Sequence, residues 1–234
     1  MNERYLQETA MLNFSSPRIK ELIDSKGWRE LPEYDRIGAV YDYVQNDILF
    51  GYNTSDTLTA EQVLSDGYGQ CNTKANLLMA LLRSVEIPCR LHAFDVAKDF
   101  QKGATSGIIS VLAPETIVHT WAEVLYDGQW LALEGVITDR KYFNAVKKRY
   151  SNVRGEFRHC AIAVEDIASH SIDWKGESTY VQSVAVVHDY GVFDSPDEFY
   201  AEHKQSWGRM KNFAYVHYGR KIMNRNVLRI RNGK

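Results

Sequence analysis

The stretch "GYGQCNTKANLLMALL", residues 67–82, places Cys71 between two glycines and an amphipathic segment. Apolar side chains recur there every three or four residues, which predicts a helix that begins at or just before Cys71 and ends before Pro88. The predicted buried stripe is Ala75, Leu78, Met79, Leu82 and Val85, and the predicted polar side carries Asn72, Lys74 and Arg83. Free N–H groups and the positive dipole end of such a helix favour an ionised sulfur and could stabilise an oxyanion on an acyl substrate. Cys71 is therefore either an activated thiolate or a small residue in the core.

A cysteine nucleophile needs a nearby imidazole and usually a third group that orients the imidazole. Residues 119–136, "HTWAEVLYDGQWLALEGV", supply both residue types on two strand-like runs around Asp127-Gly128, a preferred two-residue hairpin turn. Pairing outward from this turn places Glu123 opposite Ala132.

The same register, continued outward, places Trp121 opposite Glu134 and His119 opposite Val136. Side chains alternate across a strand, so His119, Trp121 and Glu134 are predicted to project from one face. His119 and Glu134 would be diagonal neighbours, with Cα atoms roughly 7–8 Å apart, and a hydrogen bond can bridge that gap.

The rest of the chain predicts helices first and clustered strands later, which is typical of an α+β domain. Periodicity predicts helices over 33–48 and 59–66, the second with Thr59 and Gln62 at capping-box spacing. The runs "CRLHAFDV", "CAIAVEDI" and "TYVQSVAVVH" read as strands, whereas residues 97–117 show little periodicity and form either a lid or a simple excursion. Ser195, with Pro196 and Glu198, caps a later helix, and a basic helix or tail runs from Gly208 to the end.

Size and composition are those of an ordinary soluble globular protein. The 234 residues are 44% hydrophobic and 25% charged, and the net charge of −2 gives no general attraction to nucleic acid or acidic membranes. No apolar run is as long as a membrane-spanning helix, and the first residues lack the apolar stretch of a signal peptide. We expect a cytoplasmic protein without a membrane partner or a clear nucleic-acid partner, folded as one domain over 1–234.

The three cysteines, Cys71, Cys89 and Cys160, are odd in number and contain no CxxC pair. This pattern argues against a disulfide framework and against a cysteine-rich zinc site. We expect no metal and no cofactor, with at least two of the thiols buried and reduced.

Several weaker signals have a structural and a functional interpretation. Tyr68 and Gln70 could line a substrate groove or only shape the turn, Trp121 could wall the site or cover the sheet, and His92 could border the cleft, although a core or surface role is favoured. His159 and Cys160, as neighbours in a strand, should point to opposite faces. For the basic tail, a solvated helix face is favoured over a phosphate-rich partner.

Two motif-dense segments resemble the transglutaminase-like superfamily: "DGYGQCNTKANLLMALLRSVEIPCRLHAF", residues 66–94, and "HTWAEVLYDGQWLALEG", residues 119–135. In that superfamily a cysteine opens a helix that ends in an "LLR…GIP" segment, a histidine begins a strand of "H-x-W-x-E-V" type, and an aspartate closes the next strand. The resemblance runs from about Tyr34 to about Asp139. It implies a core over 34–139 and leaves a C-terminal helical extension over 195–234.

Carried over residue by residue, Cys71 falls on the family nucleophile and His119 on its general base and acid. Glu134 falls where the family most often has aspartate, and it can accept the same hydrogen bond. Glu86 replaces the usual glycine before Ile87-Pro88. The resemblance implies a papain-like α+β core in which the cysteine-bearing helix packs on an antiparallel sheet.

The resemblance also implies acyl transfer on amides through a thioester, completed by water in hydrolysis or by a primary amine in transamidation. The sequence has no acidic loop with calcium-ligand spacing and no room for accessory β-domains. We therefore expect a small peptidase or amidase that acts on a peptide or protein amide. An amine-accepting transglutaminase and a non-catalytic binding module that retains the fold are the alternatives, because a fold does not select a reaction.

Overall fold

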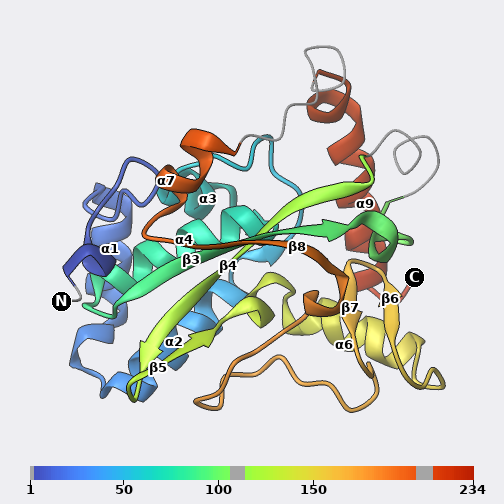
Figure 1. Ribbon diagram of the computed structural model, residues 1–234, viewed down its shortest axis with the longest axis horizontal. Helices are drawn as coiled ribbons and strands as arrows, with labels where there is room; N and C mark the ends of the chain where they lie inside the picture. The colour runs from blue at the N-terminus through green and yellow to red at the C-terminus, as the bar shows by residue number, and fades with distance from the viewer. Residues whose placement is uncertain (1–2, 106–113, 204–212) are drawn as a thin grey trace.

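Helix α4 (Cys71–Ser84) packs against strands β3 (Cys89–Ala97) and β4 (Thr116–Tyr126) of a four-stranded sheet. The computed structural model describes residues 3–105, 114–203 and 213–234, and Figure 1 shows the sheet crossing the molecule in front of α4. The order is β5-β4-β3-β8, with β5 at Gln129–Ala132 and β8 at Val186–Phe193, and all neighbours are antiparallel. The fold is α+β, as predicted, with the cysteine-bearing helix on an antiparallel sheet.

The remaining elements surround this centre. The other helices are α1 (Pro17–Lys26), α2 (Glu33–Asn46), α3 (Ala60–Asp66), α6 (Arg140–Arg149), α7 (Pro196–Glu202) and α9 (Arg220–Arg231). Strands β1 (Leu49–Phe50) and β2 (Tyr68–Gly69) pair in parallel, and β6 (Phe157–His159) and β7 (Ile162–Val164) pair antiparallel. Short 3₁₀ turns span Glu3–Leu6, Trp28–Glu30, Lys98–Gln101, Glu134–Ile137 and Ser183–Ala185, and a π-helical turn spans Tyr215–Gly219.

Local signals explain the best-predicted elements. Thr59 Oγ1 accepts from the Gln62 N–H at 3.3 Å, and Gln62 Oε1 accepts from the Thr59 N–H at 2.9 Å, so the capping box of α3 is confirmed. Asp127 and Gly128 have φ of 48° and 74°, as a two-residue hairpin turn that matches the strand twist requires.

Two hydrophobic cores meet at the start of α4. The first lies between the sheet and helices α1, α2 and α4, and the second gathers residues of α6, α9, β6 and β7 together with Phe50 and Tyr52. Figure 1 shows α6, α9, β6 and β7 at the end of the molecule away from α1. Cys71 is half-buried and packs against the second core, so the helix start lies where the two cores join.

Arg231 anchors α9 to the rest of the protein. Its Nη2 lies 2.6 Å from Asp139 Oδ2 and donates to the Phe50 carbonyl at 2.7 Å, and both side chains of the ion pair are buried. Lys221, Arg225 and Arg229 on the same helix are exposed, as predicted for a solvated face, but the expectation fails for Arg231. Part of the predicted basic helix, residues 208–212, lies outside the described residues.

The predicted polar side of α4 is wrong, because Asn72, Lys74 and Arg83 are all buried. Helices and sheet surround α4, and each of these side chains donates to neighbouring main chain; Lys74 Nζ, for example, donates to the Ile48 carbonyl at 2.7 Å.

The predicted hairpin register is confirmed from Tyr126–Gln129 to Glu123–Ala132, and the Leu133 N–H still donates to the Ala122 carbonyl at 2.9 Å, but the predicted pairs Trp121–Glu134 and His119–Val136 do not form. Strand β5 ends at Ala132, because Leu133 pairs with Thr179 in a separate parallel bridge and the Thr179 N–H donates to the Ala132 carbonyl at 2.8 Å. Trp121 and His119 therefore do not face Glu134 and Val136 across a ladder, and Glu134 begins a 3₁₀ turn.

Two later strand predictions are only partly right. Within "CAIAVEDI", β7 covers Ile162–Val164, whereas Cys160 and Ala161 have φ of 53° and 57° and make the turn between β6 and β7. Within "TYVQSVAVVH", the strand begins only at Val186 and continues beyond the predicted segment.

The other later predictions compare as follows. Ser195 Oγ accepts from the Glu198 N–H at 3.2 Å and caps α7 as predicted, but the Glu198 carboxylate accepts from the Asp194 N–H at 2.7 Å and does not close a capping box on Ser195. Of the predicted lid or excursion 97–117, residues 106–113 lie outside the described residues. In the part of the chain that the structure describes, no helix is long and apolar enough to cross a membrane.

Candidate active site

Cys71 is the first residue of α4, at the end of a tightly packed turn. A Cβ on Gly69 would come within 2.7 Å of Thr73 Oγ1 and 2.8 Å of Lys74 Cγ, so only glycine fits this close approach without displacing them. The Gln70 N–H donates to Thr73 Oγ1 at 3.0 Å, which fixes the first turn. The Cys71 side chain thus lies at the N-terminus of a fourteen-residue helix, where N–H groups and the dipole favour negative charge.

The structure brings His119 and Glu134 together. Both side chains are fully buried, and His119 Nε2 lies 2.8 Å from Glu134 Oε1. Glu134 Oε2 accepts from the Val181 N–H at 2.9 Å, so the carboxylate is held at both oxygens. His119 Nδ1 is buried without a hydrogen-bond partner among the described residues, and His119 lines the same cleft as Cys71.

Charge around His119 favours the imidazolium. Burial alone lowers the pKa of His119, but the Cys71 sulfur and the Glu134 carboxylate outweigh burial and raise this pKa to about 10. A protonated imidazole between a carboxylate and a sulfur is the arrangement that an ionised cysteine nucleophile needs.

Asn72 ties the cysteine helix to the histidine strand. Its Nδ2 donates to the Val118 carbonyl at 3.2 Å, and its Oδ1 accepts from Thr120 Oγ1 at 3.1 Å, so both residues flanking His119 are held to α4. Sequence reasoning missed this role, because helical periodicity assigned Asn72 to a polar face. Its position directly after the cysteine was the available signal.

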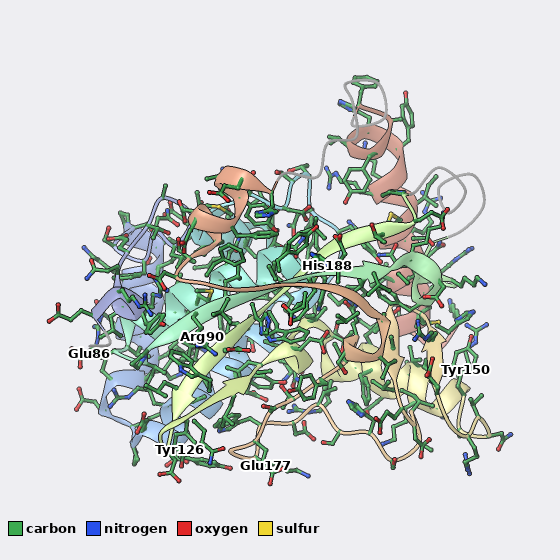
Figure 2. The ribbon with its side chains drawn as sticks, viewed as in Figure 1. Glu86, Arg90, Tyr126, Tyr150, Glu177 and His188 are labelled. Atoms are coloured by element: carbon green, nitrogen blue, oxygen red, sulfur yellow. The ribbon has the colours of Figure 1, made fainter. Side chains whose placement is uncertain are left out.

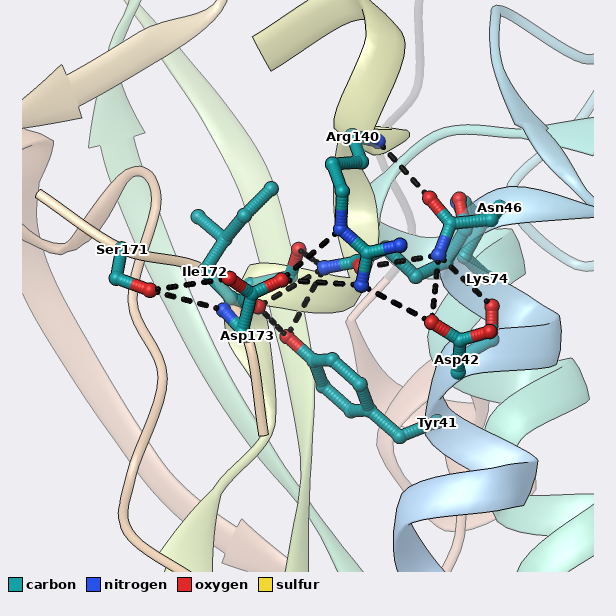
Figure 3. A network of polar contacts seen from close by, with 10 residues as sticks. Tyr41, Asp42, Asn46, Lys74, Arg140, Ser171, Ile172 and Asp173 are labelled. Carbon is teal, nitrogen blue, oxygen red and sulfur yellow. Dashed lines mark hydrogen bonds and ion pairs between the residues drawn. The ribbon is translucent and has the colours of Figure 1, made fainter. Parts of the chain in front are cut away.

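Two side chains of α2 fix the turn that carries Glu134, and Figure 3 shows one of them, Tyr41, with its hydroxyl beside Ile172. The Tyr41 hydroxyl donates to the Ile172 carbonyl at 2.7 Å and lies 3.1 Å from Thr179 Oγ1. Gln45 Nε2 donates to the Gly135 carbonyl at 3.2 Å. Tyr41 and Gln45 thereby hold the main chain around Glu134 in place.

A cleft of about 20 Å³ lies beside the sulfur, lined by Tyr52, Gln70, Cys71, Phe100, His119 and Gln182 among others. This volume has room for about one water-sized group. Gln70 lines the cleft, but its amide is already bonded: Oε1 accepts from the Asn53 N–H at 2.6 Å and Nε2 donates to Asp56 Oδ1 at 2.9 Å. Tyr52 lies in a segment without periodicity, and no sequence signal pointed to it.

Two other predicted groove residues lie elsewhere. The Tyr68 hydroxyl accepts from Arg220 at 3.2 Å, and Tyr68 is not among the residues that line the cleft. His92 bonds Glu123 at 2.7 Å and Asp189 at 2.9 Å; burial lowers the pKa of His92, but these carboxylates outweigh burial and raise it.

Trp121 supports the histidine from the same face of the sheet. Its ring lies edge-on to the His119 ring, with centroids 5.7 Å apart, and packs at a tilt against the Phe94 ring, with centroids 4.0 Å apart. It therefore walls the imidazole rather than lining the cleft.

The other two cysteines are buried, and burial raises the pKa of both thiols. The prediction that His159 and Cys160 point apart is wrong: the turn brings His159 Nδ1 within 3.0 Å of Cys160 Sγ and 3.1 Å of the Tyr150 hydroxyl. Figure 2 shows Tyr150 at the end of the molecule opposite Glu86. Among the described residues, no group of three or more histidine, cysteine or acidic side chains could hold a metal ion.

Comparison with known proteins gives one family match. Residues 24–135 match the model of the transglutaminase-like superfamily. No curated protein matches the sequence. A solved structure from Cytophaga hutchinsonii, described as that of a candidate cysteine protease, aligns with this chain at 14% identity and a TM-score of 0.47. The alignment covers 83% of this chain and 47% of the Cytophaga protein, so this chain spans about half the length of that protein.

Proposed function

We propose that the chain is a cysteine-dependent acyl-transfer enzyme acting on amides, in its simplest form a small peptidase or amidase, because residues 24–135 match the model of the transglutaminase-like superfamily. The proposed nucleophile is Cys71, the proposed acid and base is His119, and Glu134 orients the imidazole. The proposed partner is a peptide or protein amide.

The observation that carries the proposal is the buried His119. One ring nitrogen is bound to Glu134 at 2.8 Å, the other meets no acceptor at full hydrogen-bond geometry among the described residues, and the Cys71 sulfur in the same cleft is near enough to raise the pKa of the ring. A histidine that merely filled the core would be expected to satisfy both nitrogens.

The proposed reaction has two halves. The Cys71 thiolate attacks the carboxamide carbon and forms a C–S bond, and the carbonyl π electrons move to oxygen. Collapse of this intermediate breaks the C–N bond while the His119 imidazolium protonates the leaving amine, which leaves a thioester and a neutral imidazole. His119 then takes a proton from water, the resulting hydroxide attacks the thioester, and the C–S bond breaks to release the acid and the thiolate.

Thiol labelling tests the first half. We expect iodoacetamide at pH 7 to alkylate Cys71 faster than Cys89 and Cys160, as measured by peptide mass spectrometry. His119→Asn should slow Cys71 alkylation, whereas His92→Asn, a matched change in the neighbouring strand, should leave it unchanged. Equal, slow labelling of all three thiols would favour a non-catalytic binding module and contradict the proposal.

Product analysis tests the second half. We expect a pool of amide-containing peptides to yield free acid with the wild-type chain and none with Cys71→Ser. The same incubation with a fluorescent amine distinguishes the acceptors: labelled adduct without free acid would assign an amine-accepting transglutaminase instead of a hydrolase.

We also propose that residues 1–234 work as one domain, because the Arg231 anchor joins the C-terminal helix to β1 beside the site. Cytoplasmic localisation stays a prediction from the sequence.

A further inference from the structure

A cavity of about 350 Å³ lies at the C-terminal end of α4, the end opposite Cys71. Helix α4 has fourteen residues, so its two ends are about 20 Å apart. The cavity is lined from α1, from the segment before α1 and from the last turn of α4, and Glu86, one of its lining residues, marks this end of the molecule in Figure 2. A cavity of this volume is large enough for a small molecule.

The lining of the cavity carries more positive than negative charge. Three of the lining residues are cationic, Lys20, Arg29 and Arg83, whereas Glu86 is the one acidic residue among them. A concave surface with an excess of one charge attracts small molecules of the opposite charge. The cavity therefore favours an anion.

Two further carboxylates near this cavity already have partners. Asp24 Oδ1 lies 3.3 Å from Arg29 Nη1, and Glu8 Oε1 accepts from the Ser15 N–H at 2.7 Å. The other two cations of the lining form no ion pair among the described residues. Their charges are therefore not neutralised by a carboxylate of the described chain.

Arg83 is the cation with the strongest need for a counter-charge, because it is only 3% exposed. Its Nη1 donates to the Gln7 carbonyl at 2.6 Å, and its Nη2 donates to the Cys89 carbonyl at 2.9 Å and to the Asp194 carbonyl. Its Nε has no hydrogen-bond partner among the described residues. Buried charges and buried donors are normally paired, so a guanidinium that has neither a carboxylate nor a full set of acceptors indicates where an anion can bind.

The rest of the lining indicates the kind of anion. Leu6, Phe14 and Ile23 give the cavity an apolar part, which an apolar chain can cover. Free donors are few, since Arg29 already donates to the Ser84 carbonyl from Nε at 3.3 Å and from Nη2 at 3.1 Å. A carboxylate, with two acceptor oxygens, suits this supply of donors better than a phosphate does.

We propose that this cavity binds a small organic acid, namely a carboxylate on a short apolar chain, with the carboxylate beside Arg83 and Lys20 and the chain against Phe14 and Ile23. Binding is non-covalent, and no bond forms or breaks. The ligand is distinct from the substrate of Cys71, because the two sites lie at opposite ends of α4. The inference does not depend on the proposed function.

Isothermal titration calorimetry of the full chain with octanoate tests the proposal. We expect octanoate to bind at one site, and acetate and octylammonium to bind at least about 10-fold more weakly, because acetate lacks the apolar chain and octylammonium has the opposite charge. Equal affinity for octanoate and octylammonium would overturn the proposal, and so would equal affinity for octanoate and acetate.

Variants of the lining residues locate the site. Lys20→Gln should weaken octanoate binding by about 3-fold, and Glu86→Gln should strengthen it by about 3-fold, since both residues are exposed. Lys26→Gln is the matched control, because Lys26 is an exposed lysine of the same helix that does not line the cavity, and it should bind as wild type. Arg83→Gln should weaken binding by about 10-fold or more.

The exposed pair keeps the test decisive if Arg83→Gln does not fold, as circular dichroism would show. Unchanged octanoate affinity in both Lys20→Gln and Glu86→Gln would overturn the proposal. Cys71→Ser should bind octanoate as wild type does, and weaker binding by this variant would place octanoate in the cleft beside the sulfur and overturn the remote site. Absence of amide hydrolysis by the wild-type chain would overturn the proposed function alone.

Discussion

Glu134 uses each of its carboxylate oxygens for a different N–H group. Oε1 faces His119 Nε2 at 2.8 Å, and Oε2 accepts from the Val181 main chain at 2.9 Å. Because both partners are donors, neither oxygen can become a donor without a repulsive contact. The site therefore requires a charged carboxylate and not merely a polar side chain of that shape.

Glu134→Gln is expected to impair catalysis severely, because the amide NH₂ must face either the imidazole N–H or the Val181 N–H. We expect kcat/KM to fall by at least about 100-fold, as measured on whichever peptide amide the wild type cleaves. Glu123→Gln is the control, since Glu123 bonds His92 in the neighbouring strand. Equal losses in the two variants would contradict a role specific to Glu134.

The pH profile of the same variant is informative. Glu134 is one of the groups that raise the pKa of His119, so its neutralisation should move the alkaline limb of kcat/KM to lower pH. The same pKa affects stability. Because the pKa of His119 is about 10 in the folded protein and about 6.5 in the unfolded chain, protonation of His119 stabilises the fold at low pH, and this stabilisation is lost as the pH rises between those values.

Elements with local signals were predictable from sequence, and elements set by distant contacts were not. The Asp127-Gly128 turn specifies the hairpin, and the capping residues specify α3. The end of β5 depends on Thr179, which is distant in the sequence. The predicted strand pairing therefore extends too far and places Glu134 opposite Trp121, a pair that does not form. The Tyr52 contribution to the cleft depends on α9 in the same way, and local periodicity contains no information about it.

The anchoring of α9 provides a stability test. Burial raises the pKa of Asp139, but Arg231 outweighs burial and lowers it, so the pair is charged in the folded protein. Arg231→Met should lower the free energy of unfolding by about 3–5 kcal/mol, because Asp139 keeps a buried charge without its partner. Urea unfolding followed by circular dichroism measures this loss.

The double variant Asp139→Asn/Arg231→Met should be less destabilised than the sum of its single variants, since no lone charge remains. Arg225→Met, at an exposed position of the same helix, should change stability by less than about 0.5 kcal/mol. Similar values for Arg225→Met and Arg231→Met would mean that the ion pair does not hold the helix.

For the molecule as a whole, Lys74 sets part of the response to pH. It is fully buried in α4, and its Nζ donates to the Gln45 and Ile48 carbonyls at the end of α2. Burial, only partly opposed by Asp139, lowers the pKa of Lys74 to about 7. At Lys74 the unfolded chain then binds more protons than the folded one between about pH 7 and 10.4, so the contribution of Lys74 to stability rises with pH in that window.

Comparison with Lys74→Met isolates this effect, because His119 contributes equally to both proteins. Between pH 7 and pH 9 we expect the wild type to gain roughly 2 kcal/mol relative to the variant in urea unfolding. A constant difference across that range would mean that Lys74 does not lose its proton in the folded protein.

The clasp between α9 and the β1 region also bears on the order in which the protein folds. The bonds from Asn224 to Tyr52 and from Arg231 to Phe50 join residues 172 and 181 positions apart. Contacts of such separation close large loops and form late in folding. Before these contacts form, a chain with α4 in place would hold Cys71 at its helix start without the fixed Tyr52, so the cleft beside the sulfur is complete only once the two distant segments have joined.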